Sequence, residues 1–101
     1  MMATNELIVG ESIFEDYKIG GGLVTIGDDY AAEYEIRQSD GTVVQQGNIA
    51  RSTDATTWEL RVTSTVTAQL VAGEKYVLYV FEENATTGYR NNIMKMTLLV
   101  V

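Results

Sequence analysis

The chain has 101 residues, of which 46% are hydrophobic, and this length and composition suit one domain with a single core. It contains no histidine and no cysteine, which excludes the commonest general base, the thiol nucleophile and any disulfide. The net charge is −7, with only 7 Lys and Arg residues, so the chain lacks the basic surface that nucleic acids require. We therefore expect neither an enzyme nor a nucleic-acid-binding protein.

Short strand-like segments, separated by turn residues, follow one another along the chain. In order, we expect strands over residues 12–19, 23–26, 30–37, 42–49, 56–63, 74–82 and 89–101, and one helical turn over residues 66–72. The strand 30–37 alternates most cleanly, with Tyr34 on one face and Glu35 on the other. Asp40 and Gly41 then predict a hairpin, because a type I′ turn needs positive φ at both central residues.

About seven strands of this kind, without a helical pattern of 10–15 residues, predict an all-β fold. The β-branched residues agree, since Val, Ile and Thr number 11, 7 and 12. We expect an immunoglobulin-like sandwich of two antiparallel sheets, formed by residues 12–101 and preceded by an N-terminal arm of residues 1–11.

The sequence shows neither of the two patterns that would direct the protein into or across a membrane. No apolar run approaches the roughly 18 residues of a membrane-spanning helix. No charged segment, apolar segment and cleavage site follow Met1 in the way of a signal peptide. We therefore expect a protein that is made in the cytoplasm and has no membrane partner.

Four stretches carry a resemblance to a known family. They are residues 32–37 (AEYEIR), 40–44 (DGTVV), 58–63 (WELRVT) and 67–76 (TAQLVAGEKY). In this order they resemble the immunoglobulin-like domains of tailed-phage virion proteins, in particular the N-terminal domain of siphophage upper baseplate proteins. The resemblance covers roughly residues 12–100, and it implies a β-sandwich that serves as a structural part of a virion.

Candidate chemical sites are few, and each has a plain structural alternative. Asp28 and Asp29, with Glu15 or Asp16, offer the oxygen ligands that calcium prefers, but Asp and Gly are also ordinary turn formers. Tyr76, which follows a Leu-Val-Ala-Gly corner, is either the hydrogen-bonding Tyr of a tyrosine corner or a core aromatic. We expect no catalytic residue, no cofactor and no metal site.

The segment 76–81 is apolar on both faces, although a sandwich buries only one face of each sheet. Cover by the arm at residues 5–9, contact with a neighbouring subunit, and chance scatter of apolar residues all remain open. Aromatic residues and Met are enriched at interface cores, which favours the subunit contact. The predicted interface residues are Val77, Tyr79, Phe81, Met94 and Met96.

The function favoured by these features is that of a non-enzymatic phage virion structural protein. A capsid decoration subunit and a tail, baseplate or neck adaptor are equally open, with other virion proteins and copies of the chain itself as partners. We expect an oligomer within the virion. The alternative is a β-sandwich module that binds a host surface or a carbohydrate through its loops.

Overall fold

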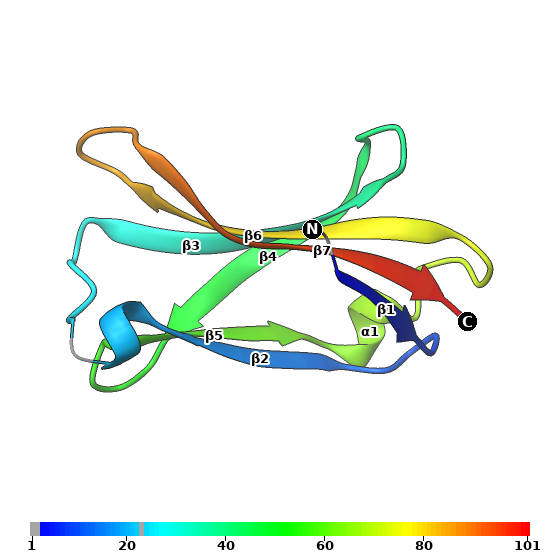
Figure 1. The fold of residues 1–101 in the computed structure, drawn as a ribbon, viewed down its shortest axis with the longest axis horizontal. Helices are drawn as coiled ribbons and strands as arrows, with labels where there is room; N and C mark the ends of the chain where they lie inside the picture. Colours follow the sequence, from blue (N-terminus) through cyan, green and yellow to red (C-terminus); the bar gives the residue numbers. More distant parts are fainter. Residues whose placement is uncertain (1–2, 23) are drawn as a thin grey trace.

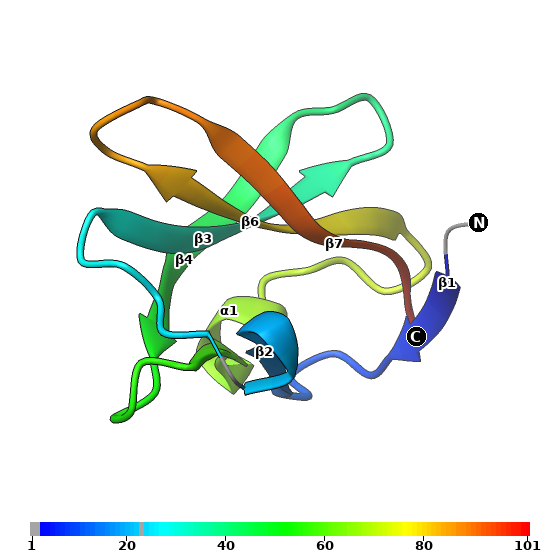
Figure 2. The same ribbon diagram turned by 60° about the vertical axis from the view of Figure 1, so that its left-hand side comes forward.

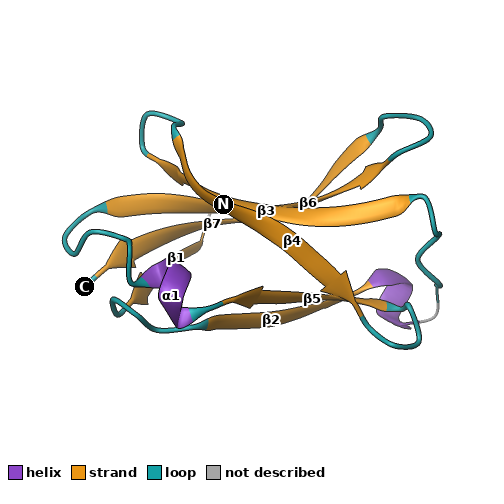
Figure 3. Cartoon of the chain, turned by 180° about the vertical axis from the view of Figure 1, so that it is seen from behind, coloured by secondary structure: helices purple, strands orange, loops and turns teal. Residues whose placement is uncertain are grey.

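The computed structural model describes residues 3–22 and 24–101, and this part of the chain is almost entirely β-structure (Figures 1 and 3). Its elements, in chain order, are β1 (Ala3–Leu7), β2 (Ile13–Lys18), the 3-10 turn η1 (Ile19–Gly22), β3 (Tyr30–Gln38), β4 (Val43–Arg51), β5 (Thr57–Val62), α1 (Ser64–Thr67), β6 (Lys75–Asn84) and β7 (Arg90–Val100). The prediction of an all-β fold with about seven strands is therefore confirmed.

The seven strands of the described residues form one curled sheet in the order β1-β7-β6-β3-β4-β5-β2. Strand β4 causes the curl, because it pairs with β3 along most of its length and with β5 only through Ala50 and Arg51. Beyond this point β5 and β2 lie opposite β3 and β6, as Figure 1 shows. The sheet is also mixed, since β1 runs parallel to β7. The prediction of two separate antiparallel sheets is corrected to a single mixed sheet that folds over itself.

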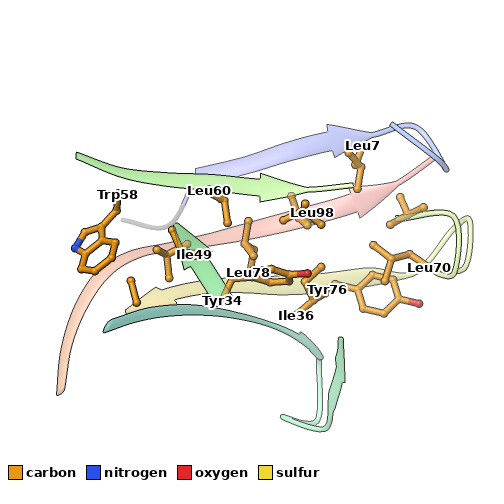
Figure 4. Packing of buried hydrophobic residues seen from close by; sticks show 14 of the residues in the cluster. Leu7, Tyr34, Ile36, Ile49, Trp58, Leu60, Leu70, Tyr76, Leu78 and Leu98 are labelled. Atoms are coloured by element: carbon orange, nitrogen blue, oxygen red, sulfur yellow. The ribbon is translucent and has the colours of Figure 1, made fainter. Parts of the chain in front are cut away.

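The core lies between the two sides of the curled sheet (Figure 4). Alternate residues of three strands point into it, as the period of a half-buried strand requires. The buried residues of these strands are Ala32, Tyr34 and Ile36 of β3, Trp58, Leu60 and Val62 of β5, and Tyr76, Leu78 and Val80 of β6. Burying each large apolar side chain contributes roughly 1.5–3 kcal/mol before conformational entropy is counted.

Residues 3–7 of the expected N-terminal arm form the edge strand β1. Its Leu7 is 4% exposed and belongs to the core, whereas Ile8, which follows, is 60% exposed. The segment extends the sheet beside β7 and is paired with that strand in register. It therefore does not lie across the apolar outer side of β6, which was the first explanation offered for that surface.

The expected strand over residues 23–26 is wrong for the residues that can be assessed, because 24–26 form no strand; Leu23 lies outside the described residues. Ile26 is nevertheless buried, and its N–H donates to the carbonyl of Ala55 at 2.6 Å. The segment is an exposed connection, anchored through the buried Ile26 to the loop before β5. The helical turn begins at Ser64, slightly earlier than expected.

The hairpin between β3 and β4 is confirmed, but its turn is not of type I′. Gly41 has φ of 91°, whereas Asp40 is not among the described residues with positive φ. The N–H of Gly41 donates to Gln38 at 2.9 Å, and Gln38 in turn donates to Thr42 at 2.8 Å. A three-residue loop with Gly in the left-handed position gives this pattern.

The tyrosine corner is confirmed. The hydroxyl of Tyr76 accepts a hydrogen bond from the backbone N–H of Val71 at 3.0 Å, while the Tyr76 side chain is only 4% exposed. The bond joins the start of β6 to the chain segment that leaves α1. It therefore fixes the corner at which the chain crosses between the two sides of the curled sheet.

Candidate interaction surface

The outer face is the side of the layer β7-β6-β3-β4 that points away from the core. Strand β6 contributes Val77, Tyr79 and Phe81 to it, because these residues alternate with the buried Tyr76, Leu78 and Val80. Tyr79 occupies the centre, since it is paired with Glu35 of β3 on one side and with Lys95 of β7 on the other.

Two cations flank the ring of Tyr79. The guanidinium carbon of Arg37 lies 4.6 Å from the ring centroid, and the ammonium nitrogen of Lys95 lies 5.3 Å from it. Arg37 is held in place by Glu35, whose Oε1 accepts a hydrogen bond from Nη2 at 2.5 Å. Each cation–π contact is worth about 0.5–1 kcal/mol at a solvated site and about 2 kcal/mol when water is removed. A partner that excludes water from this surface would therefore strengthen the two cation–π contacts of Tyr79.

Phe81 belongs to the same stripe but is already covered by its own chain. It is 2% exposed, and the guanidinium carbon of Arg90 lies 4.1 Å from its ring centroid. The pairing of β6 with β7 shifts register between Val80 and Phe81, so Phe81 is opposite Asn92. The exposed part of the stripe is consequently Val77 and Tyr79, both half-buried.

Met94 and Met96 lie on the other side of the sheet. They are paired with Val80 and Leu78, which are fully buried, and both pack against the core. The five residues of the predicted interface are therefore divided, with three on the outer face and two on the core face. The sequence could not show this, because the face of each residue in β7 depends on its pairing register with β6.

The acidic residues considered for calcium do not form a cluster. In the described parts of the chain, no group of three or more Asp, Glu, His or Cys residues is placed to hold a metal ion. Asp28 lies 3.8 Å from Arg51, and Asp16 lies 2.9 Å from Arg61, so both carboxylates face cations. Asp28 and Asp29 form a turn, across which the N–H of Tyr30 donates to the carbonyl of Gly27 at 3.1 Å.

Among the serines, Ser52 has a clear structural role. Its hydroxyl donates to Asp54 Oδ1 at 2.6 Å and accepts the backbone N–H groups of Thr56 and Thr57. The hydrogen bond from Ser52, together with those that the side chain and backbone N–H of Thr56 donate to Asp54, holds the pKa of Asp54 below its ordinary value. The network closes the loop between β4 and β5.

The cations that lie over the aromatic rings were not predicted from the sequence. Arg37 could have been placed on the outer face from the alternation of β3, but its proximity to Tyr79 requires the pairing of β3 with β6. A groove of about 360 Å³ between the edge strands β1 and β2 was not predicted either. Nothing in the sequence indicates that these two edges approach each other.

Comparisons with known proteins bear on the fold. No family model and no curated protein matches the chain. Among solved structures, the crystal structure of CopC from Methylosinus trichosporium OB3b matches with a TM-score of 0.55 and 15% sequence identity, covering 98% of this chain and 86% of that one. At this identity the likeness concerns the fold alone. No helix in the described residues is long and apolar enough to cross a membrane.

Proposed function

We propose that the chain is a non-enzymatic structural subunit of a phage virion, either a capsid decoration subunit or an adaptor of the tail, baseplate or neck. It assembles with other virion proteins and with its own copies through the outer face. The observation that carries the proposal is the placement of Tyr79 between Arg37 and Lys95 at the centre of that face.

The chemistry of the outer face suits a protein contact. Tyr and Arg are the residues that most often dominate binding energy at interfaces, and they do so where neighbouring contacts exclude water. Tyr79 is half-buried and held by its neighbours, so it would lose little conformational freedom on binding. The mixed charges of Glu35, Arg37 and Lys95 around it would set the orientation of the partner.

The assignment to a virion follows from the resemblance of residues 12–100 to immunoglobulin-like domains of tailed-phage proteins. The resemblance implies an immunoglobulin-like arrangement of the strands. In support of it, β5 and β2 lie opposite β3 and β6 across the core. A repeated particle holds its subunits by modest contacts made many times, so one face per subunit with apolar residues and mixed charges suffices.

Self-association is tested by measuring mass with light scattering over a range of concentrations. We expect wild-type chain to form oligomers, and both Tyr79→Glu and Val77→Glu to give monomers with an unchanged circular dichroism spectrum. Tyr89→Glu is the matched control, because Tyr89 is a 66% exposed aromatic on the loop between β6 and β7. A monomeric wild type, or an oligomer indifferent to Tyr79→Glu, would contradict assembly of copies through the outer face.

The location is tested separately. Particles are purified by density gradient from cells that carry the gene, and their proteins are identified by mass spectrometry. We expect the chain to be present in a fixed ratio to the major capsid or tail protein. Its consistent absence from intact particles would rule out the virion assignment, whatever the oligomeric state of the isolated chain.

A further inference from the structure

The curled sheet leaves a seam open between its two end strands, β1 and β2. These strands are the two ends of the pairing order, so within the described residues each has a strand neighbour on one side only. The seam contains a groove of about 360 Å³. Figure 2 shows β1 and β2 as the segments that end the curl, joined by the chain between them. The groove is remote from the outer face around Tyr79, since its floor belongs to the core side of β7.

The floor of the groove is apolar, and its walls are strand edges. Met96 and Leu98 of β7 form the floor, where Met96 is half-buried and Leu98 is only 2% exposed. Leu7 of β1 (4% exposed) and the half-buried Ile13 of β2 line the two sides. Strand edges of this kind present backbone N–H and C=O groups to an incoming chain. An extended segment can join such an edge as an extra strand, with alternate side chains directed toward the apolar floor.

The charge of the groove is uniform. Glu6, Glu11 and Glu15 line it, all three are exposed, and no Lys or Arg is among its lining residues. By its pairing with Leu60, Glu15 lies on the core side of β2, where it faces the opening. These carboxylates give the lining of the groove a negative charge, which complements a cationic occupant.

The same charge argues against a second copy as the occupant. The chain has a net charge of −7, and the exposed edges that a second copy would offer carry these same glutamates. Like charges placed directly opposite each other across a strand pair are destabilising. The complementary partner is therefore a different protein with an extended segment in which apolar and basic residues alternate.

We propose that the seam between β1 and β2 accepts an extended, basic segment of a partner protein as an added strand. The apolar residues of the segment would contact Met96 and Ile13, and its basic residues would pair with Glu6, Glu11 and Glu15. This site lies on a different surface from the outer face, so its test is separate from the test of assembly through Tyr79. It would allow the chain to bind one partner at the seam and another on the outer face.

The proposal is tested with two synthetic peptides of nine residues, one alternating Val with Lys and the other alternating Val with Glu. Each is titrated into the full-length chain at 150 mM salt, with binding measured by calorimetry and amide hydrogen exchange followed by NMR. We expect the basic peptide alone to bind, and to slow exchange at amides within residues 13–18 or 3–7.

Charge-reversal variants then locate the contact. Glu15→Lys and Glu11→Lys are each expected to weaken binding of the basic peptide about tenfold, which corresponds to about 1.4 kcal/mol. Asp28→Lys is the matched control, because the Asp28 side chain is fully exposed and lies outside the groove. It alters the net charge by the same amount and is expected to leave the affinity within about twofold, which corresponds to about 0.4 kcal/mol.

Several results would overturn the proposal. Equal binding of the acidic peptide would exclude charge recognition, and equal weakening by Asp28→Lys would reduce it to attraction by net charge. Binding without slower exchange in β1 or β2 would exclude strand addition. No binding of the basic peptide at 1 mM, together with self-association of Glu15→Lys, would show that the glutamates only protect free edges from pairing with other copies.

Discussion

The indole N–H of Trp58 donates a hydrogen bond to Glu82 Oε2 at 2.9 Å, and this bond ties the two sides of the curled sheet together. Trp58 comes from β5 and is 1% exposed, whereas Glu82 comes from β6 on the opposite side of the core. A buried Trp usually finds a partner for its N–H, and here the partner is a carboxylate. Asn91 donates to the other carboxylate oxygen at 3.3 Å, so Glu82 joins three strands.

Replacing Glu82 with Leu is expected to lower the free energy of unfolding by about 1–3 kcal/mol, because the indole N–H would be left without its acceptor. Glu82→Gln retains an acceptor oxygen and is expected to cost less. Urea unfolding followed by the fluorescence of Trp58, the single Trp of the chain, measures both values. Equal stability of Glu82→Leu and wild type would show that water replaces the bond without loss.

The tyrosine corner gives a second prediction. Tyr76→Phe removes only the hydroxyl that accepts the Val71 N–H, and it is expected to lower stability by about 0.5–1.5 kcal/mol. Tyr79→Phe is the matched control, because that hydroxyl belongs to a half-buried residue on the outer face. Thermal unfolding by circular dichroism measures the difference, and an equal effect of the two changes would contradict a special role for the corner.

The strands of the core could be predicted from the sequence because their alternation is strict. Residues 30–37 and 56–63 were expected as strands, and β3 and β5 lie there within two residues. Strand β1 was not predicted, since among its residues 5–7 only Leu7 is buried, and the strand takes its position from parallel pairing with β7. Such pairing joins segments more than 90 residues apart, and local pattern carries no information about it.

The single curled sheet also escaped prediction. The number of strands is the same for two stacked sheets and for one sheet that folds over, and the difference lies in β4 alone. Two residue pairs, Ala50 with Glu59 and Arg51 with Trp58, connect the two sides. The candidate site could be predicted only in part, because strand pairing that the sequence does not reveal decides the face of some of its residues. Val77 and Tyr79 follow from alternation, whereas the faces of Met94 and Met96 depend on register.

Gly47 in the middle of β4 permits close contact with Tyr34. A Cβ atom built at Gly47 would lie 2.7 Å from Cε1 and 2.8 Å from the hydroxyl oxygen of Tyr34, whose side chain is buried. Gly47→Ala is therefore expected to destabilise the fold by about 1–3 kcal/mol. Gln46→Ala on the same strand is the control. Urea unfolding of Gly47→Ala in wild-type and Tyr34→Leu backgrounds should show a smaller loss in the second, and equal losses would exclude the clash as the cause.

Tyr17 on β2 makes stability depend on pH in the alkaline range. Burial, and secondarily the charge of Glu15, raises the pKa of Tyr17 from 10.0 to about 12. The pKa is higher in the folded state, so the stabilising contribution is complete below pH 10. It falls as pH rises toward 12, because the unfolded chain ionises first.

Two pKa units correspond to about 2.7 kcal/mol, which solvent around the half-buried ring reduces to about 1 kcal/mol. Tyr17→Phe is therefore expected to lose about 1 kcal/mol less stability than wild type between pH 9 and pH 11.5 in urea unfolding. Tyr89→Phe, on an exposed loop, should follow wild type. If Tyr17→Phe also follows wild type, and ultraviolet titration finds no tyrosine with a pKa near 12, the ring of Tyr17 is solvated and β2 packs less tightly on β5 than its position opposite Trp58 implies.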